Sequence, residues 1–219
     1  MADQSLILAF ALVLGACAAP AQHAVIVPAA TRPPEVAFSD DPRPLPHYHS
    51  KRLALTVPLP DGHAWRIDDH TLPELVATHE QTHSKVVLAV IRADEIVGRQ
   101  QCEALARDRK LVPDGKLRTL EDAVDVTQEN YDTRIWVAVE PGSGPTSPVV
   151  GHVLAFGGFL RKCYVFHYST EVGAAADEPV LSARLAYARE RILGGMQLDP
   201  FAAVPREKPS AGPEVAPPP

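Results

Sequence analysis

The sequence predicts an α+β fold, with an antiparallel β-sheet flanked by two main helices at about 95–110 and 178–194. Three observations support this class. Segments with the two-residue alternation of β-strands dominate the middle of the chain, whereas the two helical segments show a three-to-four-residue apolar spacing. The strand segments are joined by short turn signals, which favour antiparallel pairing because parallel strands need long crossovers. Strands and helices in this order are typical of a sheet with helices packed on it.

Proline marks the limits of the domain. Of the 22 prolines in 219 residues, seven lie in residues 18–46 and seven in residues 200–219. Segments of this composition cannot bury a core and are typical of extended tethers and disordered tails. We therefore expect a Pro-rich tether over 17–46, one domain over 50–198 and a Pro-rich disordered tail over 199–219.

The first part of the domain predicts short strands followed by one long strand. Apolar residues alternate at 53–57, 65–67 and 75–78, and Pro60-Asp61-Gly62 is a turn signal between the first two. The run Val86–Ile91 is apolar on both faces, so it predicts a central strand that is covered on both sides.

A helix and two strands should follow. Asp94 can cap a helix that runs to about Lys110, with Cys102 on its apolar face. Residues 124–126 indicate a weak strand, and the alternation over 135–139 indicates a stronger one.

The clearest hairpin signal lies between Val149 and Tyr168, with Gly157-Gly158 as a two-residue turn. In its second arm the aromatic residues Tyr164, Phe166 and Tyr168 share one face. We expect these rings to pack under a helix. The alternative is that they line a cleft for a small apolar ligand.

The closing helix is predicted from its cap, its stripe and its end. Asp177 stands at the start, and Gly194-Gly195 ends the pattern. The apolar stripe consists of Leu181, Leu185, Ala188 and Ile192.

The first 17 residues are typical of an export signal that ends in a lipidation site. The apolar run over 6–14 is about half the roughly 20 residues that span a bilayer. Leu14-Gly15-Ala16-Cys17 resembles a bacterial lipobox, which implies a signal peptide over 1–16 and acylation of Cys17. Ala18, in place of Asp, favours the outer membrane under the rule for such lipoproteins. Because residues 1–5 contain no Lys or Arg, ordinary cleavage and secretion as a soluble protein is the alternative.

Two cysteines remain after Cys17. Cys102 and Cys163 form an even pair, and an oxidising compartment favours a disulfide between them. Such a bridge would close a loop of roughly 60 residues and stabilise the fold by about 2–4 kcal/mol. Two buried free thiols are the alternative.

The segment His79-Glu80-Gln81-Thr82-His83 spells H-E-x-x-H, the pattern of zinc peptidases. On a helix, His79 and His83 would bind zinc and Glu80 would activate a water, with Glu103 as a candidate third ligand. A strongly β-branched strand follows directly, so we favour an exposed hairpin tip over 80–84. We expect no stoichiometric zinc in the purified protein.

Composition and other motifs argue against further sites. We expect His47 and His49 to be solvated in the tether, and His152 and His167 to be ordinary sheet residues. The sequence contains no nucleophile elbow, P-loop or dinucleotide fingerprint, so we expect no cofactor and no catalytic residues. The net charge is −6 and the Lys and Arg residues are scattered, which argues against nucleic-acid binding.

The segment Leu55–Trp65 resembles the start of PsbP-like domains, which begin with a strand, a Pro-Asp/Glu-Gly-type turn and a Trp. The strand pair over 74–78 and 85–92 and the closing helix also suit that family. The resemblance covers about 52–195, although this chain carries two additional residues before the Trp. It implies an antiparallel sheet flanked by helices, no general catalytic residues and, in many bacterial members, secretion or a lipid anchor.

These observations predict a lipid-anchored protein of the bacterial cell envelope, in the outer membrane and facing the periplasm or the cell surface. Its domain is expected to bind or to serve a structural role without catalysis. The chain would contact the membrane through its lipid and would have an envelope protein or polymer as its partner. A zinc peptidase and a small apolar-ligand carrier are the alternative functions.

Overall fold

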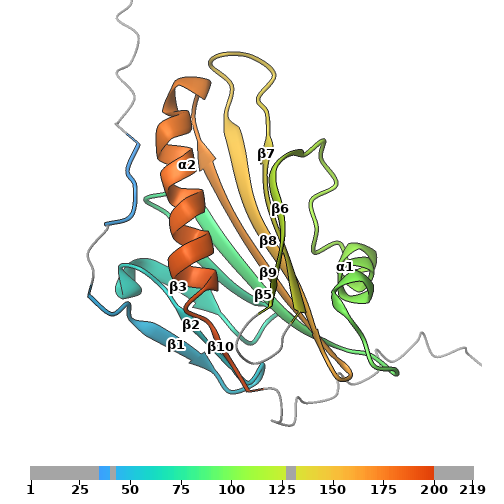
Figure 1. Ribbon diagram of the computed structural model, residues 1–219. Helices are drawn as coiled ribbons and strands as arrows, with labels where there is room; N and C mark the ends of the chain where they lie inside the picture. The colour runs from blue at the N-terminus through green and yellow to red at the C-terminus, as the bar shows by residue number, and fades with distance from the viewer. Residues whose placement is uncertain (1–34, 40–42, 127–131, 200–219) are drawn as a thin grey trace, which may run out of the picture. The chain divides into compact units, whose positions relative to one another are not determined.

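A seven-stranded antiparallel sheet forms the centre of the computed structural model, which describes residues 35–39, 43–126 and 132–199 (Figure 1). The strands are β1 His47–Ser50, β2 Leu55–Pro58, β3 Trp65–Asp68, β4 Leu75–His79, β5 Ser84–Arg92, β6 Arg118–Val126, β7 Asp132–Glu140, β8 Val149–Phe159, β9 Lys162–Val172 and β10 Gln197–Leu198. The α-helices are α1 Arg99–Asp108 and α2 Glu178–Tyr187, with shorter helical turns η1 Gly62–Ala64, η2 Ala175–Asp177 and η3 Ala188–Leu193. The predicted α+β class is confirmed.

The large sheet has the strand order β3-β4-β5-β9-β8-β7-β6, and a smaller sheet has the order β1-β2-β10. Every neighbouring pair is antiparallel, both where a short connection joins the two strands and in β5–β9 and β2–β10, which are far apart in the chain. β5 and β9 join the two halves of the large sheet, because Val86 pairs with Tyr168 and Ile91 with Cys163. The apolar run over 86–91 is therefore a central strand, as predicted.

One face of the large sheet is covered by α2, η3 and the small sheet (Figure 1). Leu181 and Leu185 of α2 and Ile192 of η3 are buried against this face, so the predicted apolar stripe packs as expected. The aromatic residues Phe166 and Tyr168 also lie in this core. These two rings pack under the helix, as expected, and the apolar-ligand alternative stays a prediction.

The opposite face is covered by α1 and by the segment that follows it. Cys102 and Ala106 of α1 pack there with Leu154 and Phe156 of β8. The helix begins at Arg99 and not near Asp94, because residues 93–97 are tied to the β8–β9 hairpin. Val97 N–H donates to the Leu160 carbonyl at 2.8 Å, and Gly98 is the N-cap residue.

The predicted glycine turn at Gly157-Gly158 is wrong. Both glycines lie inside β8, and the turn consists of Leu160 and Arg161, with Phe159 paired to Lys162. Tertiary packing explains the position of Gly158. A Cβ on Gly158 would lie 2.3 Å from the Val97 carbonyl oxygen, so only glycine lets the segment before α1 approach the strand this closely.

The structure differs from the expected tether at two places. His47, Tyr48 and His49 lie in β1, which pairs with β2, so they belong to the domain and not to the tether, while the His47 and His49 side chains are exposed to solvent, as expected. Residues 35–39, which we call the strap, lie against the domain beside α2, where Phe38 is buried (Figure 1). Residues 1–34, including the predicted signal peptide and Cys17, and the tail over 200–219 lie outside the described residues.

Candidate functional site

The H-E-x-x-H segment is not helical. β4 ends at His79, residues 80–83 form a turn and β5 begins at Ser84. The ring of His79 is buried at 1% exposure, whereas His83 is exposed and has a φ of 46°. The two rings therefore do not share a helical face with Glu80, and the helical zinc-peptidase geometry is contradicted.

The hairpin tip is confirmed as a turn, but it is only partly exposed. Thr82 and Ser84 are buried and belong to a network of hydroxyl groups. Ser84 Oγ lies 2.9 Å from the Tyr168 hydroxyl and 3.0 Å from Thr170 Oγ1. The hydroxyl groups of Thr82 and Ser84 are thus satisfied by hydrogen bonds inside the fold.

Arg184 of α2 lies beside this network and is completely buried, at 0% exposure. Its guanidinium donates to the carbonyl oxygens of Thr82 and Glu171, both at 3.0 Å, and to Thr170 Oγ1 at 3.3 Å. These bonds connect α2 to the β4–β5 turn and to β9. The donors on the other side of the guanidinium, Nε and Nη2, remain for a further partner.

That partner is the strap. Arg184 Nε donates to the Val36 carbonyl at 2.7 Å, and its Nη2 lies 3.1 Å from a carboxylate oxygen of Glu35. The other carboxylate oxygen accepts from the Gly173 backbone N–H at 3.2 Å. A buried cation and a backbone N–H thus form a carboxylate-binding site, and charge-assisted bonds of this kind are the strong ones.

An aromatic cluster lies beside the carboxylate. The ring centroid of Phe38 is 5.2 Å from Tyr187, 5.5 Å from His79 and 6.2 Å from Trp65. Trp65 is fixed by its indole N–H, which donates to the Pro60 carbonyl at 2.6 Å. The strap therefore fills the site with one acidic and one aromatic side chain, three residues apart.

His79 belongs to this cluster, where its surroundings disfavour the charged ring. Its Nδ1 lies 2.8 Å from Thr82 Oγ1, while its buried Nε2 has no hydrogen-bond partner among the described residues. Burial lowers the pKa of His79 and the Arg184 charge lowers it further, while Asp61 opposes both effects. We call Trp65, His79, Gly173, Arg184 and Tyr187 the strap site.

Of the strap site, sequence analysis singled out only His79, and for a different chemistry. A signal for Arg184 was nevertheless present. It follows Leu181 by three positions, inside the apolar stripe of the closing helix, where a charged residue must find buried partners. Glu35 and Phe38 carried no local signal, because Arg184 and Tyr187, which they contact, lie about 150 residues away in the chain.

A second polar cluster, in which His152 is buried and His167 and Glu140 are half-buried, joins β7, β8 and β9. His152 Nδ1 lies 3.1 Å from His167 Nε2, and His152 Nε2 lies 3.5 Å from a Glu140 carboxylate oxygen. Burial lowers the pKa of His167 to about 3, and the charges of His152 and Lys85 add to this effect, while a backbone hydrogen bond with Leu111 opposes it. Burial also lowers the pKa of His152, against the opposing effect of Glu140. These histidines are sheet residues that pair with each other.

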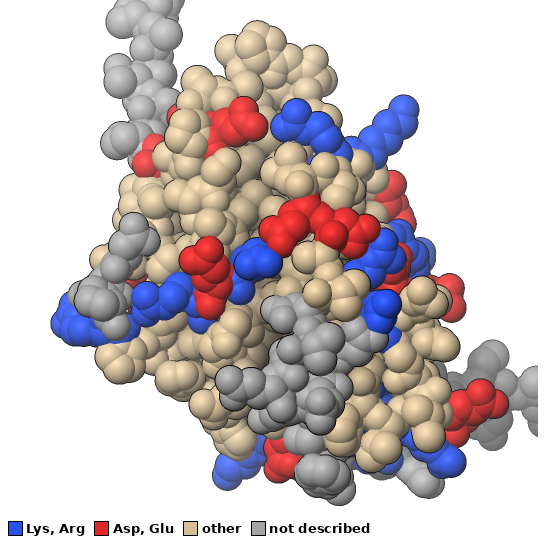
Figure 2. Space-filling view, viewed as in Figure 1, with Lys and Arg blue, Asp and Glu red and all other residues tan. Residues whose placement is uncertain are grey.

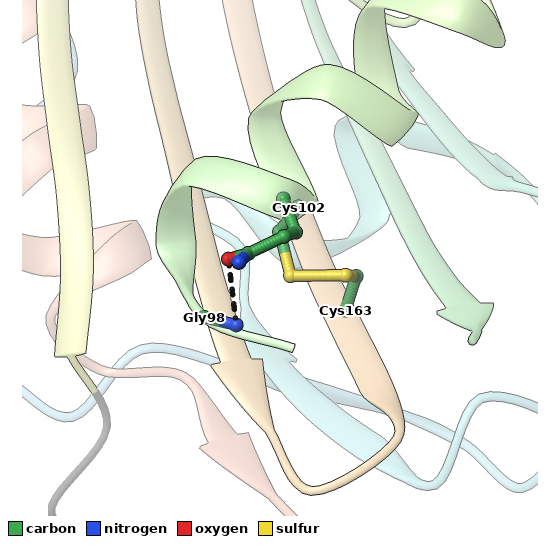
Figure 3. The surroundings of a disulfide bond; sticks show 4 residues. Gly98, Cys102 and Cys163 are labelled. Carbon is green, nitrogen blue, oxygen red and sulfur yellow. Dashed lines mark hydrogen bonds between the residues drawn. A yellow bond between two sulfur atoms is a disulfide. The ribbon is translucent and has the colours of Figure 1, made fainter. Parts of the chain in front are cut away.

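The two predicted disulfide residues are brought together. Cys102 in the first turn of α1 is bonded to Cys163 of β9, with a Cα–Cα distance of 5.2 Å (Figure 3). The Cys102 N–H donates to the Gly98 carbonyl at 3.1 Å, which fixes the first turn of the helix above the strand. Both cysteines have 0% exposure, so the bridge lies inside the core.

Charge on the visible face of the domain is mixed. Figure 2 shows Lys and Arg side chains interspersed with Asp and Glu over the face that α2 covers. Several of them are paired, such as Arg189 with Glu121 at 2.7 Å and Arg118 with Glu178 at 3.6 Å. Within the ranges that the structure describes, no helix is long and apolar enough to span a membrane.

Comparisons with known proteins give similarity at the level of structure only. No family model and no curated protein matches the chain. The crystal structure of the Ran-binding protein Mog1p from Saccharomyces cerevisiae is similar at 10% identity and a TM-score of 0.48, covering 70% of this chain and 94% of that one. A protein from Bacteroides thetaiotaomicron is similar at 7% identity and a TM-score of 0.42, covering 73% of this chain and 50% of that one. Values this low transfer neither a partner nor an activity.

Proposed function

We propose that the chain is a lipid-anchored protein of the bacterial cell envelope whose α+β domain is a non-catalytic binding module. The observation that carries this proposal is the buried bond between Cys102 and Cys163. Disulfides of this kind persist in oxidising compartments. The export signal over 1–16 and the lipobox ending in Cys17 would deliver the chain to such a compartment.

Binding is favoured over catalysis by the chemistry of the strap site. Arg184 and the Gly173 N–H hold a carboxylate, and Trp65 and Tyr187 flank an aromatic ring. These groups recognise a ligand without supplying a nucleophile. We infer that the partner is a protein or polymer of the envelope, that Ala18 directs the anchor to the outer membrane, and that the domain is PsbP-like.

The anchor is tested by labelling cells with radioactive palmitate. The wild-type chain should incorporate the label and sediment with membranes, because several acyl chains bind a bilayer stably. Cys17→Ser should lose the label and move to the soluble fraction, whereas the nearby change Gln22→Ala should behave as wild type. An unlabelled wild-type chain, together with unchanged fractionation of Cys17→Ser, would refute the proposal.

A further inference from the structure

The strap is attached to the domain by few groups. Two of its side chains make the contacts, Glu35 through its carboxylate and Phe38 through its ring, and the Val36 carbonyl adds a hydrogen bond. The side chains of Val36, Ala37 and Ser39 are exposed. The strap is also not a strand of either sheet. Segments with so few buried contacts open locally at a lower free energy than the strands of a core.

The site itself requires an occupant with a negative charge. Arg184 is fully buried, and its three acceptors outside the strap are neutral oxygens of Thr82, Thr170 and Glu171. Removal of Glu35 would leave a buried cation without its carboxylate, which is costly. Exchange for another carboxylate is therefore favoured over simple opening.

The aromatic part of the strap site consists of three rings that enclose the ring of Phe38. Tyr187, His79 and Trp65 surround the ring of Phe38, and the unpartnered Nε2 of His79 lies in the same cluster. Phe38 offers that nitrogen no hydrogen bond. An incoming aromatic residue with a polar edge could satisfy it, so the strap is not the best occupant that the site allows.

We propose that the strap site recognises a protein segment in which a carboxylate residue precedes an aromatic residue by three positions, and that the strap occupies it until such a segment takes its place. The Val36 carbonyl identifies the ligand as a polypeptide, because Arg184 Nε binds a main-chain oxygen directly after the acidic residue. This inference rests on the proposed binding function and is independent of the anchor.

The strap has an advantage over a free segment because it belongs to the same chain. A tethered ligand acts at an effective concentration in the millimolar range, so a free segment of equal affinity competes poorly. Weakening the strap should reveal the intrinsic affinity of the site. The partner is thus expected to bind tightly only when its contacts are better than those of Glu35 and Phe38, or when it is held nearby.

The experiment measures binding of a fluorescent peptide with the sequence of residues 33–40 to the purified full chain by fluorescence anisotropy. Glu35→Ala/Phe38→Ala should bind this peptide at least about tenfold more tightly than wild type, because the competing strap is lost. The matched variant Ala37→Ser/Ser39→Ala changes only exposed strap residues and should bind as wild type does. A peptide carrying the same Glu35→Ala and Phe38→Ala changes should lose at least about tenfold in affinity.

An intact disulfide and a wild-type circular dichroism spectrum would show that the Glu35→Ala/Phe38→Ala chain is folded. If this folded chain bound the peptide no better than wild type does, the proposal would be overturned. If this variant is destabilised, the thermal midpoint provides the test. The peptide should raise the midpoint of the variant and leave that of the wild type unchanged, since a ligand of the native state stabilises it. The absence of any shift would equally overturn the proposal. Neither measurement depends on acylation of Cys17. A failure of the strap-site proposal can therefore be told apart from a failure of the anchor proposal.

Discussion

Arg184 connects more separate parts of the domain than any other side chain described above. It binds the strap through Val36 and Glu35, the β4–β5 turn through Thr82, and β9 through Glu171. Buried cations are stable only when their donors are satisfied and their charge is compensated. Arg184 meets both conditions with residues from three segments, so it contributes mainly by fixing their arrangement relative to α2.

We expect Arg184→Met to lower the free energy of unfolding by about 3–5 kcal/mol, because a buried carboxylate and several carbonyls lose their donor. The measurement is urea unfolding followed by circular dichroism. Arg118→Met is the control, because its ion pair with Glu178 is 62% exposed on both sides and should contribute less than about 1 kcal/mol. Equal effects of the two substitutions would contradict the role assigned to Arg184.

The buried histidine pair predicts a loss of stability in acid. The pKa of His167 is about 3 in the folded chain and that of an unperturbed histidine is 6.5, so between these values the unfolded chain binds more protons. The free energy of unfolding should therefore fall as the pH is lowered from about 6.5 toward 3, by up to about 1.4 kcal/mol per pH unit for one such histidine. His152, whose pKa is also lowered, should contribute in the same direction.

His167→Gln should reduce this pH dependence, even if it lowers stability at every pH. Unfolding in urea at several pH values between 7 and 4 gives the slope of the free energy of unfolding against pH. His63→Gln, at an exposed position, is the control and should retain the wild-type slope. Lys85 and Glu140 also face the pair and remain in both variants, so identical slopes for all three chains would show that His167 is not the group responsible.

At the scale of elements, Gly158 decides how closely α1 approaches the sheet. Its substitution by alanine would place a Cβ 2.3 Å from the Val97 carbonyl oxygen and 2.9 Å from Gly98 Cα. Because both neighbours are backbone atoms, we expect Gly158→Ala to destabilise the fold by about 1–3 kcal/mol. Gly144→Ala is the control, since its added Cβ would meet only Ser147 Oγ at 3.7 Å. Urea unfolding of both variants tests this, and equal stabilities would contradict the close packing.

The sequence could predict elements whose own residues carry the pattern. The central strand over 86–91 and the stripe of the closing helix are found as expected, because their periodicity reflects burial directly. Elements set by distant contacts could not be found this way. The residues of β1 are polar and depend on pairing with β2. Gly158 was assigned to a turn because its packing partners, Val97 and Gly98, lie about 60 residues earlier.

The same limit applies to the start of β2. The alternation over 53–57 suggested one strand, yet Ala54 has a φ of 53° and the strand begins only at Leu55. Leu53 is buried all the same, at 3% exposure. A buried apolar residue in a turn has the same pattern as one in a strand, so burial was predicted correctly and backbone conformation was not.

At the scale of the whole domain, each face of the large sheet carries a long-range connection to β9. Arg184 joins α2, β9 and the strap on one face, and the Cys102–Cys163 bond joins α1 to β9 on the other. β9 takes part in both, and it is also the strand that pairs with β5 and β8. The stability of the domain should therefore depend strongly on how α1 is held against β9.

We expect the Cys102–Cys163 bond to stabilise the domain by about 2–4 kcal/mol, because it removes conformational freedom from an unfolded loop with a sequence separation of 61. Cys102→Ala/Cys163→Ala should show this loss in urea unfolding, and reduction of the wild type should reproduce it. Cys17→Ser is the control and should unfold as the oxidised wild type does. Thiol titration of the denatured, unreduced wild type provides an independent check. Two reactive thiols besides Cys17 would show that the bond does not form in the protein, and the argument for an oxidising compartment would then fail.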